Sequence, residues 1–139
     1  MAESEVHPRR ASRLVEIEEC INQAIAVPGS LGASLIDYTT GSTICSAGRH
    51  ANDDDDLTGS GTASVVRAVV HGPAFVLAGR PSRLDDIVIT SSNGYHIIHF
   101  IPTRSDSRLV LYVWLDPVSG NLALAKRSLR TIARRLVAG

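Results

Sequence analysis

Two histidines have a spacing that invites comparison with a metal site. His96 and His99 lie three residues apart in a β-rich run, and imidazole is a common ligand of Zn²⁺. Successive side chains of a strand point to opposite faces, so residues three apart lie on different sides of the sheet. We therefore interpret both histidines as ordinary strand residues.

Four consecutive aspartates, Asp53 to Asp56, could attract a divalent cation. Consecutive carboxylates at a helix start point in different directions, whereas Ca²⁺ needs several converging oxygens. Negative charge there is stabilised by the helix dipole, and Asn or Asp is a favoured N-cap. We interpret the run as capping and solvation, with Asn52 or one of the aspartates as the N-cap.

Nucleophilic and nucleotide chemistry find no complete motif. No G-x-S-x-G follows a predicted strand, and the TGSGT stretch at 58–62 lacks a P-loop lysine. Cys20 and Cys45 form no C-x-x-C pair and have no histidine at zinc-site spacing, so both are expected to be reduced and buried. The sequence predicts no catalytic residue, no metal site and no cofactor.

The charge balance limits the partners. Fourteen basic and fourteen acidic residues cancel, so the long-range attraction of a basic protein to nucleic acid or anionic lipid is missing. One segment near the end is strongly basic. This segment offers a candidate contact face for an acidic partner, which consists of Lys126, Arg127, Arg130 and Arg134. Cations near a helix C-terminus are common for electrostatic reasons alone, so that reading stays open.

With 139 residues, the chain fits one domain. Residues 1–11 are expected to be a disordered tail and residues 12–137 the domain. No apolar run reaches the roughly 18 to 20 residues that span a bilayer, and the N-terminus has no apolar signal region. We expect a cytoplasmic protein without membrane insertion.

Three amphipathic helices are predicted. The first has apolar residues at helical spacing from Leu14 to Ile25, and the last is expected to begin near Asn121 as its cap. The second covers about 52–72, although Gly59 and Gly61 each weaken a helix by roughly 1 kcal/mol relative to alanine. Its end, near 71–73 or further on after a kink, is left open.

Two turn motifs predict β-hairpins. In the first, DYTTG, Asp37 and Thr40 supply polar side chains and Gly41 supplies the positive φ of a tight reversal. In the second, Asn93 and Gly94 are the pair best suited to a type I′ turn. A later strand, RLVLYVWL, is apolar on both faces and is expected to be covered on both sides. Its Tyr112 and Trp114 are assigned to the core.

The element order α-β-β-α-β-β-β-α predicts the fold class. It is an α/β single-domain sandwich, with an antiparallel five-stranded sheet and helices on both faces.

The second helix carries more apolar surface than one sheet can cover. Its valines span a broad arc, and an exposed contiguous apolar patch is rare in a soluble monomer. A twofold partner would cover it, with the third strand pairing across the axis. We therefore expect a homodimer whose dimer or partner interface contains Val65, Val66, Val69, Val70, Ile87 and Ile89.

Three segments resemble, in order and spacing, the Roadblock family of dynein light chains and its bacterial relatives. They are IAVPGSLGASLIDYTTGSTI (25–44), LDDIVITSSNGYHIIHFI (84–101) and LVLYVWLDPVSGNLALAKRSLRTIARRL (109–136). The resemblance covers about residues 12–137. It implies the same Roadblock-like, profilin-like fold and a non-catalytic protein that dimerises through the second helix and third strand.

The resemblance also implies a function in bacterial signalling. Such proteins are regulators or scaffolds of small Ras-like GTPases, either activating or recruiting them, as homodimers or as pairs with another Roadblock chain. The alternative is a small-ligand sensor of the PAS-like type, because this fold class does not fix a function. A polar-lined pocket between helix and sheet would favour the sensor, and a filled core with an apolar outer surface would favour the scaffold.

Overall fold

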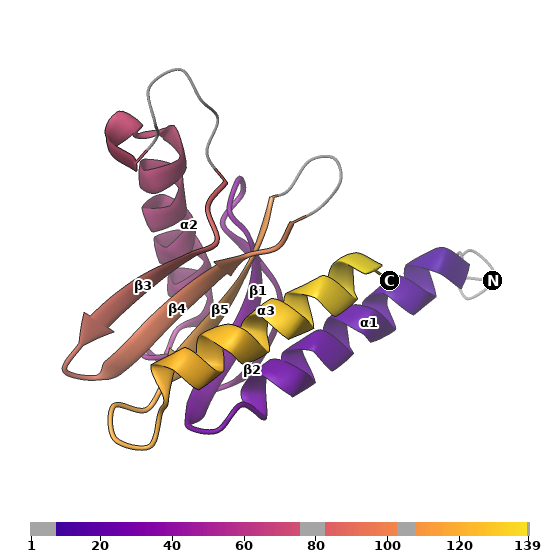
Figure 1. The fold of residues 1–139 in the computed structure, drawn as a ribbon. Coiled ribbons are helices and arrows are strands. Elements are labelled where there is room, and N and C mark those ends of the chain that lie inside the picture. Colours follow the sequence, from indigo (N-terminus) through magenta and orange to yellow (C-terminus); the bar gives the residue numbers. More distant parts are fainter. Residues whose placement is uncertain (1–7, 76–82, 103–107, 139) are drawn as a thin grey trace.

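The computed structural model describes residues 8–75, 83–102 and 108–138. Three long helices and five strands form one sandwich (Figure 1). In chain order the elements are α1 (Pro8–Ile25), β1 (Ser30–Asp37), β2 (Ser42–Gly48), α2 (Asp55–His71), the 3₁₀ turn η2 (Pro73–Phe75), β3 (Asp86–Ser91), β4 (Gly94–Phe100), β5 (Leu109–Leu115) and α3 (Leu122–Ala138).

The strands form one antiparallel sheet in the order β2-β1-β5-β4-β3. The apolar strand β5 lies at its centre, and both faces of β5 are buried. Leu111, Val113 and Leu115 belong to one core cluster, whereas Tyr112 and Trp114 belong to the other. The predicted two-sided burial of this strand is confirmed.

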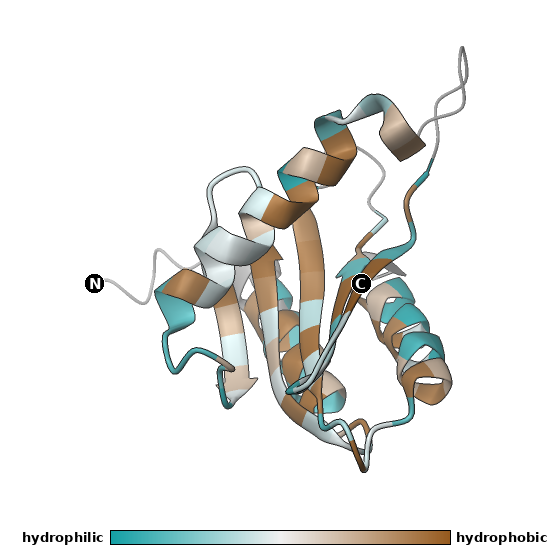
Figure 2. Ribbon diagram, turned by 90° about the vertical axis from the view of Figure 1, so that its left-hand side faces the viewer, coloured by the Kyte–Doolittle hydropathy of each residue, from teal (hydrophilic) through white to brown (hydrophobic). Residues whose placement is uncertain are grey.

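The helices lie on opposite faces of the sheet. Helices α1 and α3 run side by side on one face, and α2 crosses the other (Figures 1 and 2). Ile21 of α1 and Leu129 of α3 belong to the larger core, whereas Val66 of α2 belongs to the smaller one. The predicted fold class is therefore confirmed.

The first hairpin forms as its motif predicts. The Asp37 carboxylate accepts hydrogen bonds from the backbone N–H of Thr39 at 2.9 Å and from its hydroxyl at 2.6 Å. Gly41 donates its N–H to the Asp37 carbonyl at 2.8 Å and adopts φ +80°. Partial burial alone would raise the pKa of Asp37, but these hydrogen bonds outweigh it and lower the pKa.

The second hairpin forms, but the predicted type I′ turn is wrong. A type I′ turn needs positive φ at both of its central residues. Among the described non-glycine residues only Asp53 has a positive φ, so neither Ser92 nor Asn93 meets this requirement. Ser91 pairs with Gly94, so the loop consists of Ser92 and Asn93. The indole N–H of Trp114 donates to the Asn93 carbonyl at 2.9 Å, so a contact with β5 helps to fix the turn.

Helix α2 lies close to the first hairpin because Gly59 has no side chain. A Cβ on Gly59 would come within 2.5 Å of the Gly41 carbonyl oxygen and 2.7 Å of the Thr43 hydroxyl. At Gly61 a Cβ would meet nothing within 4 Å. The close approach therefore explains Gly59, whereas Gly61 has no such requirement within the described part of the chain.

The helix boundaries refine the sequence expectations. Asp54 caps α2, accepting from the N–H groups of Asp56 and Leu57, and α2 ends at His71. Asn121 caps α3 through the N–H of Leu124 at 3.0 Å, as predicted. Helix α1 begins at Pro8, so residues 8–11, which were predicted to belong to the tail of residues 1–11, are helical. Residues 1–7 lie outside the described ranges.

Opposite stability changes are expected for alanine at the two α2 glycines. Gly59→Ala forces a Cβ into the first hairpin and should destabilise the fold by about 1–3 kcal/mol. Gly61→Ala should stabilise it by about 0.5–1 kcal/mol, because alanine favours the helix. Urea unfolding of both variants measures this difference, and a stabilising Gly59→Ala would contradict the close approach.

Candidate functional site

The apolar residues predicted to contact a partner lie on α2 and on the edge strand β3. We name five of them the contact surface: Val65, Val69, Val70, Ile87 and Ile89. Strand β3 is the last strand of the sheet and pairs with β4 alone among the described strands. Helix α2 packs mainly over β1 and β2, so it leaves the β3–β4 half of this face less covered.

The strand register places the two isoleucines on the α2 side. Ile87 lies opposite Ile98, and Ile98 belongs to the same core cluster as Val66. Ile89 lies two residues further on the same face, with 40% of its surface exposed. The predicted residues of α2 and β3 therefore share one side of the sheet.

Val66 does not belong to this surface. It is fully buried in the core beneath α2, so it has no surface left for a partner, and we remove it from the predicted interface. Val65, Val69 and Val70 are half-buried, because part of the arc of valines already packs within the chain. The sequence pattern could not distinguish the inward valine from its neighbours.

A polar network borders the contact surface on β4 and β5. His96 Nδ1 lies 2.7 Å from the Tyr112 hydroxyl, and His96 Nε2 lies 2.9 Å from the Asn93 side-chain oxygen. In neutral His96, one ring nitrogen accepts from Tyr112 while the other donates to Asn93. Arg49 lies over the Trp114 ring at 5.4 Å from its centre. Both ring nitrogens of His96 therefore have a hydrogen-bond partner.

The two histidines lie on opposite faces, as predicted. His96 stacks on Trp114 on the α2 side, whereas His99 lies near Asp86 and Arg130 on the α3 side. Burial lowers the pKa of each histidine. Burial likewise raises the pKa of Tyr112 to about 12.

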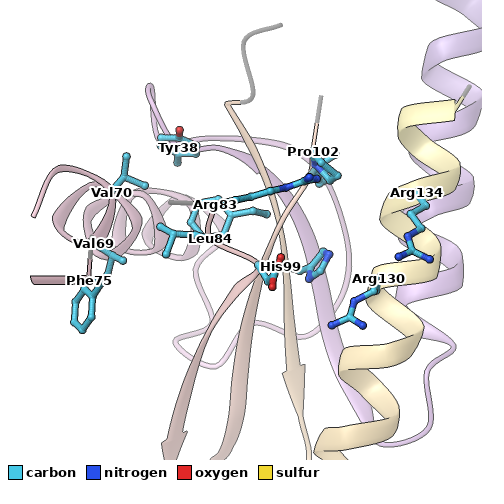
Figure 3. Close-up of a pocket in the computed structure, with 13 residues that line it drawn as sticks. Tyr38, Val69, Val70, Phe75, Arg83, Leu84, His99, Pro102, Arg130 and Arg134 are labelled. Carbon is cyan, nitrogen blue, oxygen red and sulfur yellow. The ribbon is translucent and has the colours of Figure 1, made fainter. Parts of the chain in front are cut away.

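A groove of about 720 Å³ opens beside the contact surface, where the end of α2, the start of β3, the end of β4 and α3 converge (Figure 3). Its lining is part apolar and part cationic. The residues that line it are Tyr38, Val69, Val70, Phe75, Arg83, Leu84, Asp85, His99, Phe100, Ile101, Pro102, Arg130 and Arg134.

The structure divides the predicted basic face. Arg130 and Arg134 line the groove, whereas Lys126 forms an ion pair with Asp86 at 3.6 Å. Arg127 is exposed and lies outside that lining. The sequence analysis did not predict the groove. The four-residue spacing of Arg130 and Arg134 was a visible signal, but the approach of β4 to α3 was not.

The other candidate groups have structural partners. Asp54 caps α2, and Asp55 lies 3.3 Å from His50. No three His, Cys, Asp or Glu side chains gather for a metal ion within the described ranges.

Cys20 and Cys45 are free thiols, and burial raises the pKa of Cys20 to about 11. No helix in the described part of the chain is long and apolar enough to cross a membrane.

Comparison with known proteins bears out the fold. The sequence matches no protein-family model and no curated protein. Solved structures match over nearly the whole chain, and the chain has the Roadblock-like fold that its motifs predict. The first is an MglB with a tetrameric arrangement, with a TM-score of 0.70 and 17% identity over 92% of this chain and 89% of that one.

Two further structures have the same fold. The gliding protein MglB from Thermus thermophilus has a TM-score of 0.66 and 15% identity, over 96% of this chain and 92% of that one. MglC from Myxococcus xanthus has a TM-score of 0.52 and 18% identity, over 91% of this chain and 98% of that one. At these identities the likeness concerns the fold.

Mild acid is expected to destabilise the fold through the half-buried His96 and the buried His99. His96 and His99 have pKa values below the usual 6.5, so the unfolded chain takes up protons first as the pH falls. The stability that the neutral rings contribute is present above about pH 6.5 and declines as the pH falls through their folded pKa values. Asp37 loses its contribution only at lower pH, because its pKa lies below 3.8.

Urea unfolding at about pH 7.5 and pH 5.5 measures this dependence. The double variant His96→Gln, His99→Gln should unfold with a smaller difference between the two pH values than the wild type. An equal difference in both proteins would contradict the assignment to these histidines.

Proposed function

We propose that the protein is a non-catalytic, dimeric regulator or scaffold of a small Ras-like GTPase that acts in the cytoplasm. The observation that carries the proposal is the contact surface on α2 and β3, beside an edge strand. The sequence resemblance to Roadblock proteins supports the GTPase as partner. The shared fold with the gliding protein MglB is consistent with the same class.

The dimer follows from how this surface would be covered. An edge strand exposes unpaired backbone groups and tends to pair with another strand. Two copies related by a twofold axis would pair β3 with β3 and bring Ile89 of each copy toward the other α2. Another Roadblock chain could use the same surface to form a hetero-pair.

Regulation of a GTPase does not require a catalytic residue from this chain. A partner can position the GTPase's own residues around the nucleotide, or it can recruit the GTPase to a complex. The candidate basic face on α3 offers a second contact, because Arg127, Arg130 and Arg134 are exposed. Such a face suits an acidic region of the partner.

The oligomeric state tests the contact surface. The wild type should sediment with twice the chain mass of 14.8 kDa at micromolar concentration. Ile89→Glu should shift the protein toward monomer, because it places a charge in an apolar contact. Leu124→Glu is the matched control, since Leu124 is 41% exposed against 40% for Ile89 and lies on α3. A wild-type monomer, or equal dissociation of both variants, would rule out this surface.

Affinity capture tests the partner. Wild-type protein and the Leu124→Glu control should recover a small GTPase from native cell extract, with GDP or a GTP analogue present. Single-turnover GTP hydrolysis with and without the protein then separates activation from recruitment. If neither bait recovers a GTPase in either nucleotide state, the regulator proposal is wrong.

The small-ligand sensor remains the second candidate, and the groove favours it. A volume of about 720 Å³ lies within the range of roughly 300–1,000 Å³ that is usual for ligand pockets. Its lining combines apolar and charged side chains, as ligand sites commonly do.

A further inference from the structure

We propose that the groove lined by the end of α2, residues 83–85 before β3, the end of β4 and α3 binds a phosphate-bearing small molecule with an apolar or aromatic body, of the nucleoside monophosphate class. This inference goes beyond the GTPase partner and does not depend on the proposed dimer. It rests on the charge of one side of the groove, on a buried histidine there and on the apolar opposite side.

The charged side of the groove is cationic. Arg83, Arg130 and Arg134 line the groove, and Asp85 is the one carboxylate among the described residues of the same lining. Within the described ranges, none of the three arginines has a carboxylate within ion-pair distance. The neighbouring Asp86 is already paired with Lys126 at 3.6 Å. The groove therefore has an excess of positive charge that an anion would balance.

The two α3 arginines are spaced to act on one anionic group. Residues four apart on a helix are neighbours, with about 5–6 Å between their Cβ atoms. Figure 3 shows Arg130 and Arg134 projecting from α3 on the side of His99. Guanidinium groups bind phosphate oxygens through paired N–H donors, and two such groups suit a dianion.

His99 provides the independent observation. Its side chain lines the groove with 6% of its surface exposed, and its Nδ1 is buried without a hydrogen-bond partner. Buried polar atoms without partners are uncommon in folded proteins, and each one calls for an explanation, such as a bound ion or a functional role. The ring lies near Asp86 and Arg130, the two charges that act most strongly on it, so the unsatisfied atom lies on the α3 side of the groove.

The opposite side of the groove is apolar. Val70 and Leu84 lie there with Tyr38 and Phe100, whose rings meet edge to face at 6.3 Å between centres. A free inorganic anion would leave this wall without a contact. An aromatic body attached to the phosphate would cover it, and burial of that surface is favourable.

Binding of AMP to the full chain tests the proposal by isothermal titration calorimetry. Three probes separate the contributions: AMP carries both groups, adenosine lacks the phosphate, and inorganic phosphate lacks the body. AMP should bind more tightly than either of the other two. The double variant Arg130→Gln, Arg134→Gln should weaken AMP binding by roughly tenfold or more.

The control is Arg127→Gln, Arg135→Gln, which removes the same charge from α3 outside the groove lining. It should leave the AMP affinity within a factor of about two, since neither side chain lines the groove and water and salt weaken the effect of exposed charges. Thermal unfolding of both variants, followed by circular dichroism, verifies that they fold.

Three results would overturn the proposal. The first is no heat of binding for AMP at millimolar concentration. The second is equal affinity for AMP and inorganic phosphate, which would indicate an adventitious ion only. The third is equal loss of affinity in both double variants. None of these results bears on capture of a GTPase, so this proposal and the proposed function can fail separately.

Discussion

Burial of β5 on both faces is the constraint on which the rest of the fold depends. A strand with apolar residues on both sides must lie in the middle of a sheet and be covered above and below. Helices α1 and α3 cover one face together, and Arg13 of α1 donates to the Leu136 carbonyl of α3 at 2.6 Å. Among the described elements, helix α2 alone covers the other face. One helix is narrow for a sheet of five strands, and the less covered part of this face, at β3, is the candidate partner surface.

The position of α2 determines both candidate sites. Gly59 lets the start of the helix lie against the first hairpin, which directs α2 over β1 and β2 and away from β3. The end of the helix then stands beside the start of β3 and the end of β4. The contact surface and the groove share Val69 and Val70 for this reason, so a ligand in the groove and a partner on the surface would meet along α2.

Local chemistry predicted much of the fold, and tertiary contacts explain the rest. The turn at Asp37 and Gly41 and the cap at Asn121 depend on residues next to them in sequence, so they could be predicted. The turn at Asn93 depends on Trp114, which lies 21 residues away, and its type was predicted wrongly. The burial of Val66 and the presence of the groove depend on how α2, β4 and α3 pack. Hydrophobic periodicity does not reveal this packing. Partners and ligands are harder still to predict from the sequence, because they depend on which side chains meet on the folded surface.

Hydrogen exchange at the two sheet edges tests the proposed dimer most directly. Strands β2 and β3 both end the sheet, but the apolar contact surface adjoins β3. Exchange measured by mass spectrometry over a range of protein concentrations compares peptides covering 86–91 with peptides covering 42–48. We expect the β3 amides to become protected as the concentration rises, while the β2 amides exchange at an unchanged rate. Unchanged exchange at β3, or concentration-dependent protection at β2 alone, would contradict a dimer formed through α2 and β3.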